Sequence, residues 1–127
     1  MPPEAVPTPN APPVAGPYSP AVRAGDWLVL AGQIGFDPAS GQIPKGVGDQ
    51  ARQALANIAT VLADCGASLT DVAKVTVFTT AIGNMAKIND VYAEAFADHR
   101  PARSTIGVAG LPAEALIEIE VWAHVPA

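Results

Sequence analysis

Charged side chains interrupt two short β-prone runs near the end of the chain. Arg103 opens the first run, and Glu118 and Glu120 alternate with aliphatic residues in the second. Because successive side chains of a strand point to opposite faces, we expect Glu118, Glu120 and Trp122 on one face and the aliphatic residues on the other. An arginine and carboxylates on neighbouring strands could hold a small charged substrate and activate water beside it.

The two kinds of charged group suit different tasks. The guanidinium of Arg103 is a planar fork that can bind a carboxylate through two parallel hydrogen bonds. The carboxyl group of Glu118 can take a proton from an attacking water and give one to a departing group. Burial would raise the pKa of Glu118 and a nearby Arg103 would lower it, so the sequence leaves the direction open.

Structural roles compete with these assignments. Arg103 could instead form an ion pair with Glu118 or Glu120 across strands. Glu120 could take part in the reaction, although a salt bridge at an interface is the role that we favour for it. Cys65 falls on the apolar face of a predicted helix, where we expect packing in the core and not catalysis.

The elements that carry these residues follow from the spacing of apolar side chains. Helical spacing predicts helices over residues 49–65 and 84–97. Strands are expected at 22–24, 27–31, 72–80, 103–108 and 116–125. The order β-β-α-β-α-β-β describes an α+β fold, a mixed sheet with two helices on one face.

Two helices leave the other face of the sheet open. We expect that face to carry Glu118, Glu120 and Trp122 from the last strand and Arg103 and Thr105 from the strand before it. A mixed polar and aromatic face is poorly suited to full exposure. The prediction is therefore that neighbouring subunits cover it and that a charged pocket forms between chains.

The first twenty residues form a proline-rich arm. They hold eight of the thirteen prolines, and proline fixes φ and lacks an N–H donor, which disfavours helix and central strand. We treat residues 1–127 as a single domain whose arm over 1–15 begins as a loose segment. Tyr18 could anchor the end of this arm through its ring or donate a hydrogen bond to a substrate.

Composition limits the classes of function. The chain has 127 residues, a net charge of −5 and only 15% charged residues, which suggests that another copy covers part of its surface. The absence of a basic run argues against nucleic acid. The single cysteine excludes an internal disulfide, and the two histidines show no metal-ligand spacing. Without an apolar run of about 20 residues or a secretory leader, the expectation is a cytoplasmic protein with no membrane contact.

Four segments in order carry motifs that resemble one known family. They read GPYSPAV at 16–22, AGQI at 31–34, KVTVF at 74–78, and RPARS through LP to IEIE between 100 and 120. The last motif is highly specific. The chain therefore resembles the reactive intermediate deaminase family, called RidA, YjgF or L-PSP.

The resemblance implies a chorismate-mutase-like fold that assembles as a homotrimer with clefts between subunits. It implies hydrolysis of short 2-imino acids and enamines, such as 2-iminopropanoate and 2-iminobutanoate, to 2-oxoacids and ammonia. Such imines arise from pyridoxal-phosphate enzymes acting on serine or threonine, so the role is metabolite damage control. No cofactor and no metal is implied.

The resemblance also assigns roles to single residues. By position in the motifs, Arg103 would bind the substrate carboxylate and Glu118 would orient or activate water. Tyr18 and Asn89 would line the cleft, and the backbone at Gly32 would help to enclose it. From the residues alone, Asn89 follows an inward-facing helix residue and would lie on the helix surface.

Two positions depart from the common family pattern. Ala31 stands where serine is frequent, and Thr105 stands where cysteine is frequent, on the same strand face as Arg103. These changes bear on the substrate more than on the fold. They leave room for a non-catalytic trimer that binds 2-oxoacids or other metabolites. An RNA-cleaving translation inhibitor of the L-PSP type is a further reading, against which the acidic charge argues.

Overall fold

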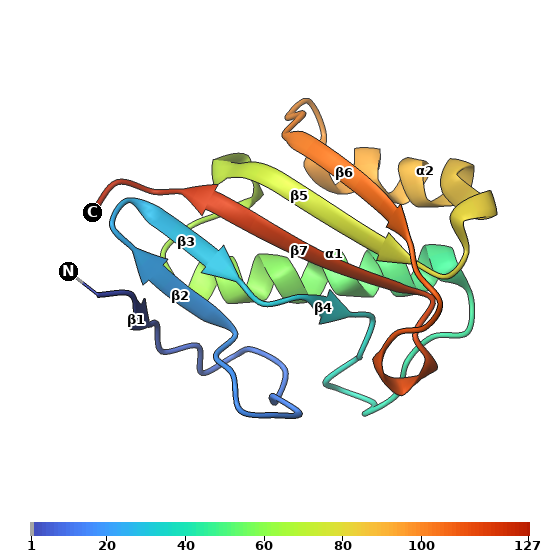
Figure 1. The fold of residues 1–127 in the computed structure, drawn as a ribbon, viewed down its shortest axis with the longest axis horizontal. Helices are drawn as coiled ribbons and strands as arrows, with labels where there is room; N and C mark the ends of the chain where they lie inside the picture. The colour runs from blue at the N-terminus through green and yellow to red at the C-terminus, as the bar shows by residue number, and fades with distance from the viewer. Residues whose placement is uncertain (1) are drawn as a thin grey trace.

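Seven strands form one mixed sheet, and two helices cover one of its faces (Figure 1). The computed structural model describes residues 2–127. Its strands are β1 (Glu4–Ala5), β2 (Ala21–Ala24), β3 (Trp27–Leu30), β4 (Gln33–Ile34), β5 (Val72–Thr79), β6 (Ala102–Gly107) and β7 (Ile117–His124). Its helices are α1 (Val47–Asp64) and α2 (Met85–Phe96). The predicted α+β class and the order β-β-α-β-α-β-β are confirmed, with β1 and β4 as short additional strands.

The sheet is ordered β1-β2-β3-β7-β5-β6, and β4 pairs with the beginning of β7. Only the β5–β6 pair is parallel, because α2 carries the chain back between the two strands. The central strand β7 therefore lies between β5 on one side and β3 and β4 on the other. Figure 1 shows β7 crossing the middle of the sheet over α1.

The core lies between the sheet and the helices. In β7 the residues Ile117, Ile119, Val121 and Ala123 are buried, so the predicted alternation is confirmed. Helical side chains such as those of Ile58, Leu62 and Ile88 fill the other side of this core. Burying each large aliphatic side chain contributes about 1.5–3 kcal/mol, which fixes the sheet against the helices.

Helix α1 begins two residues earlier than the predicted Asp49. Gly46 is the extended residue before the helix, and Val47 is buried, so apolar packing extends the first turn. The predicted end is close to the observed one, because Gly66 takes a φ of +76° after Cys65 and stops the helix. Neither helix of residues 2–127 is long and apolar enough to cross a membrane.

The strand register corrects one prediction. Arg103 pairs with Val75 and Thr105 pairs with Val77, and both valines point into the core. Paired residues of neighbouring strands share a face, so Arg103 and Thr105 lie on the helix side of the sheet. The expectation that they share the open face with Glu118 is wrong.

The proline-rich arm lies against the body of the protein. β1 pairs with β2, and the backbone N–H and side-chain amide of Asn10 donate to Asp64 of α1 at 2.9 and 2.7 Å. Pro12 is buried. The segment that we expected to begin as a loose arm thus has a defined course from Glu4 onward, and it reaches the edge of the pocket described next.

Candidate active site

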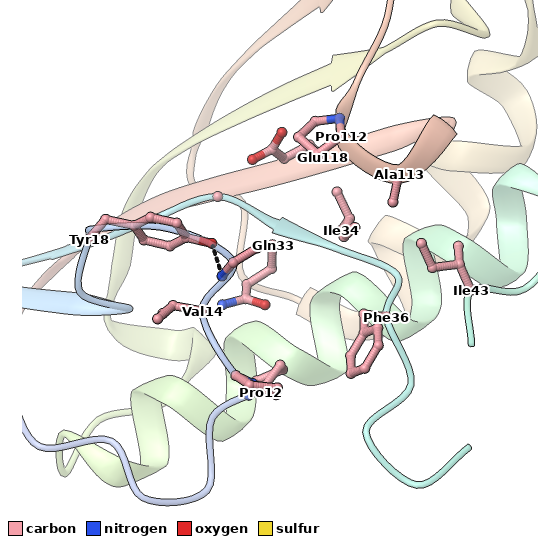
Figure 2. A pocket seen from close by; sticks show the side chains of 13 residues that line it. Pro12, Val14, Tyr18, Gln33, Ile34, Phe36, Ile43, Pro112, Ala113 and Glu118 are labelled. Carbon is pink, nitrogen blue, oxygen red and sulfur yellow. Dashed lines mark hydrogen bonds between the residues drawn. The ribbon is translucent and has the colours of Figure 1, made fainter. Parts of the chain in front are cut away.

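Glu118 lies on the open face of the sheet at the point where β7 has a neighbour on each side. It pairs with Ile34 of β4 and with Phe78 of β5. Alternation along β7 turns its side chain away from the helices, next to Glu120 on the same face, as predicted. The side chain is half-buried, in the wall of a pocket that opens on this face (Figure 2).

Gly32 leaves the space that the Glu118 carboxyl group occupies. A Cβ added at Gly32 would lie 2.8 Å from Cδ of Glu118 and closer still to Oε2. The requirement is one of space, since any side chain at position 32 would push the carboxyl group aside. Within a single chain Gly32 therefore lines the pocket beside the Glu118 carboxyl group, and the implied part of its backbone in enclosing a substrate cleft stays a prediction.

The pocket beside Glu118 is largely apolar and has a volume of about 430 Å³. Three segments build it: the arm, the chain from β4 into the following loop, and the turn before β7. The lining residues include Pro12, Val14, Tyr18, Gln33, Ile34, Phe36, Ile43, Pro112, Ala113 and Glu118. Figure 2 shows Glu118 and Pro112 on one side of this space and Pro12 and Phe36 on the other.

Tyr18 contributes both to the arm and to the pocket. Its hydroxyl accepts a hydrogen bond of 3.4 Å from the backbone N–H of Ala15, drawn as the dashed line in Figure 2. Its ring is exposed and lines the pocket. The structure thus shows Tyr18 anchoring the arm, and a hydrogen bond from its hydroxyl to a substrate stays a prediction.

Burial raises the pKa of the Glu118 carboxyl group, and the negative charge of Glu120 raises it further. The sequence left open whether the pKa of Glu118 is raised or lowered, and in the single chain it is raised. Within the same chain Arg103 lies on the other face of the sheet, where it cannot counter these effects. A carboxyl group with a raised pKa is a stronger base and stays protonated closer to neutral pH, so it can accept a proton and hold it until a leaving group takes it.

Arg103 belongs to a different surface of the chain. Its guanidinium lies over the ring of Tyr92 from α2, with Cζ 4.7 Å from the ring centroid. Within residues 2–127 the one salt bridge joins Arg52 and Asp49. The alternative of an ion pair between Arg103 and Glu118 or Glu120 is therefore excluded within one chain.

The six predicted site residues fall into two groups. Tyr18, Gly32 and Glu118 meet at the pocket. Arg103 and Thr105 lie on β6, the edge strand, with their side chains toward the helix layer. Asn89 is exposed on α2, beside the buried Ile88, as the helix pattern indicated.

Sequence reasoning missed most of the apolar pocket wall. Gln33 and Pro112 stand inside recognised motifs, so these motifs could have indicated them. Val14, Phe36 and Ile43 lie in segments without regular periodicity, and nothing in the sequence marks them as neighbours. No group of three His, Cys, Asp or Glu residues in the described part of the chain is placed to hold a metal ion.

The chain is similar in sequence and in structure to known proteins from several organisms. A RutC family protein of Pyrococcus horikoshii is 49% identical over 122 residues, covering 95% of this chain and 97% of that protein. A 2-iminobutanoate/2-iminopropanoate deaminase of Bos taurus is 44% identical over 117 residues, covering 91% of this chain and 85% of that protein. The crystal structure of E. coli TdcF with bound serine matches with a TM-score of 0.90 and 39% identity, over 95% of this chain and 98% of that one.

The family model described as endoribonuclease L-PSP matches residues 8–125, nearly the whole chain. The fold and the motifs around Tyr18, Gly32 and Glu118 lie inside this match. The resemblance drawn from the four sequence motifs is confirmed, and the chain belongs to the RidA/YjgF family, also called L-PSP.

Proposed function

We propose that the protein hydrolyses short 2-imino acids and enamines, such as 2-iminopropanoate and 2-iminobutanoate, to 2-oxoacids and ammonia. The observation that carries the proposal is the Glu118 carboxyl group, which has a raised pKa and lies in the wall of a largely apolar pocket against Gly32. Relatives of Bos taurus and Dermatophagoides farinae, each 44% identical, are named as deaminases of these imines.

The reaction needs one group that both accepts and donates a proton. Water adds to the carbon of the C=N bond and gives a proton to the Glu118 carboxylate. The protonated carboxyl group then donates this proton to the nitrogen, which gives a carbinolamine. The same carboxylate next moves the hydroxyl proton of that adduct to the nitrogen as the C–N bond breaks, so that C=O and ammonia result. One carboxyl group can serve both transfers because its proton returns to the leaving amine.

Arg103 is the proposed carboxylate clamp, contributed by a neighbouring chain. Within one chain Arg103 and Glu118 lie on opposite faces of the sheet and are separated by β5, so a site with both groups needs two subunits. A homotrimer with clefts between subunits meets this requirement. Thr105 shares the face of Arg103, and Asn89 lies on the neighbouring helix, so these residues would enter the cleft from the same subunit.

The direct test generates 2-iminobutanoate in solution with a threonine dehydratase and follows release of 2-oxobutanoate. The wild-type protein should accelerate release above the uncatalysed rate. Glu118→Gln should lose nearly all of this acceleration, and Arg103→Ala should raise KM. Glu94→Gln, which changes an exposed glutamate of α2, is the matched control and should behave as wild type. A wild-type rate equal to that of buffer would refute the proposal.

A metabolite-binding trimer without turnover is the second candidate. The serine bound to E. coli TdcF favours it, since that structure reports a ligand and a chain 39% identical to this one. Calorimetric titration with 2-oxobutanoate separates the two. The second candidate requires binding that depends on Arg103, together with no imine hydrolysis by the wild type and no effect of Glu118→Gln.

A further inference from the structure

Tyr92 lies beneath the guanidinium of Arg103 on the helix side of the sheet. The distance of 4.7 Å from Arg103 Cζ to the ring centroid falls within the range of about 6 Å over which a ring face attracts a cation. The ring is itself held in place. Tyr92 is only 7% exposed and packs against Phe96, one turn further along α2, at a centroid distance of 4.7 Å.

Among residues 2–127 the Arg103 side chain has no salt bridge and no hydrogen bond, and the ring of Tyr92 is the group that holds its guanidinium. An arginine carries five N–H donors, and a salt bridge would occupy the same donors that a ligand carboxylate needs. A ring face interacts with the charge of the guanidinium and leaves those donors unused. Tyr92 can therefore hold Arg103 without competing with an anionic ligand.

The hydroxyl group of Tyr92 makes no contact that would account for a tyrosine at this position. Its oxygen is buried and has no hydrogen-bond partner among the described residues, a state that disfavours folding. Burial raises the pKa of Tyr92 while the charge of Arg103 opposes that rise, so the two groups are close enough to interact electrostatically. The ring, and not the hydroxyl, is the part that meets the cation.

We infer that Tyr92 is a positioning residue that holds the guanidinium of Arg103 by its ring face and presents the N–H fork to the carboxylate of a ligand. The inference rests on the proposed function, in which Arg103 binds that carboxylate. The ring would act alike in the ground state and the transition state, because the ligand carboxylate keeps its bonds and its charge while the C–N bond on the neighbouring carbon breaks. Loss of the ring should therefore raise KM and leave kcat unchanged.

The test compares Tyr92→Leu with Tyr92→Phe. Binding of 2-oxobutanoate is measured by calorimetry, and KM and kcat are measured with 2-iminobutanoate. Tyr92→Leu should weaken binding about five- to tenfold and raise KM by the same factor with kcat unchanged. Tyr92→Phe keeps the ring and should retain wild-type values. Val91→Ala removes a buried group of α2 that lies toward α1, so it should lower the melting temperature without changing Kd.

The outcomes separate this inference from the proposed function. Wild-type affinity in Tyr92→Leu, together with lost binding in Arg103→Ala, would overturn the inference alone. Wild-type affinity in Arg103→Ala would overturn the clamp itself. Binding by Tyr92→Phe as weak as by Tyr92→Leu would assign the role to the hydroxyl and also overturn the inference. If Tyr92→Leu does not fold, Tyr92→Met, which lacks a ring but has a long apolar side chain, takes its place.

Discussion

At the scale of single residues, the site depends on the space and the charge around Glu118. Gly32 leaves the volume that the carboxyl group fills, and Glu120 and burial raise its pKa. Both effects arise from groups that β4 and β7 bring together. Changing either the space or the charge should therefore alter Glu118 without disturbing the rest of the core.

Replacing Gly32 with alanine should lower activity sharply. The added Cβ would displace the carboxyl group of Glu118, and displacements of about 1 Å in a reacting group can cost on the order of 100-fold in rate. Imine hydrolysis should fall by about that factor in kcat/KM, measured with the coupled dehydratase assay. Gly83→Ala is the control, because a Cβ there meets no atom within 4 Å. Full activity in Gly32→Ala would show that Glu118 needs no such space.

The raised pKa of Glu118 also predicts a dependence of stability on pH. A carboxyl group whose pKa is raised on folding binds more protons in the native state, so its contribution to stability is complete at low pH and is lost as the pH rises through the folded pKa. Glu118→Gln removes the ionisable group, so the variant does not lose this stability as the pH rises. The variant should melt at a higher temperature than wild type at pH 7, and the difference should vanish below the ordinary pKa of 4.5. Melting temperatures across pH 3.5–8 test this, and a constant difference would contradict it.

At the scale of elements, α1 holds the loop that forms one wall of the pocket. The amide of Asn57, which is buried, donates to the carbonyls of Ile34 and Phe36 at 3.2 and 2.8 Å. Gln50 donates to the carbonyl of Pro44 and accepts from the N–H of Leu116, at 2.7 and 2.8 Å. Two polar side chains on the inner face of a helix thus determine where the loop and the start of β7 lie.

Removal of the Asn57 amide should therefore weaken both the fold and the pocket. Asn57→Ala leaves two half-buried carbonyls without their donor, at a cost of about 2–4 kcal/mol in the free energy of unfolding. Because Ile34 and Phe36 line the pocket, KM should rise as well. Urea denaturation and the hydrolysis assay measure the two effects. Thr60→Ala, on the same helix, should change stability by less than about 0.5 kcal/mol, and an Asn57→Ala variant no weaker than this control would refute the prediction.

At the scale of the whole molecule, the open face of the sheet is incomplete in one chain. Trp27 and Trp122 form an edge-to-face pair there, with ring centroids 6.4 Å apart, and remain 38% and 45% exposed. Glu118 lies on this face, whereas Arg103 lies on the other. In a closed cyclic assembly each chain can cover the open face of one neighbour and present its own β6 edge to a neighbour. Every site would then receive Glu118 from one chain and Arg103 from another.

Two defective variants should therefore restore activity when they assemble together, measured at a substrate concentration well below KM, where the raised KM of Arg103→Ala lowers its rate. Arg103→Ala supplies an intact Glu118, and Glu118→Gln supplies an intact Arg103. After joint unfolding and refolding in equal amounts, random assembly should return about one quarter of the wild-type activity, because each site draws one side chain from each of two chains. Each variant refolded alone is the control. No recovery in a mixture that has demonstrably exchanged subunits would refute a shared site.

Features that depend on residues close together in the chain could be predicted from the sequence, whereas features that depend on contacts between distant segments could not. The helices, the main strands and the inward face of β7 follow from the periodicity of neighbouring residues, and they were predicted correctly. β4 was missed because two residues between glycines carry no period. The side occupied by Arg103 was predicted wrongly, because a one-residue change in register reverses the face of a strand, and the parallel pairing of β6 with β5 sets that register.

The sequence by itself determined the order of the elements, the family and the residue types that could act on an imine, since motifs and periodicity are local properties. Only the tertiary structure decided that Glu118 and Gly32 share a pocket with the arm, that the pKa of Glu118 rises, and that Arg103 rests on Tyr92 away from Glu118. These facts depend on which segments distant in the chain pack together. Packing is decided by the whole core and cannot be read from any one segment.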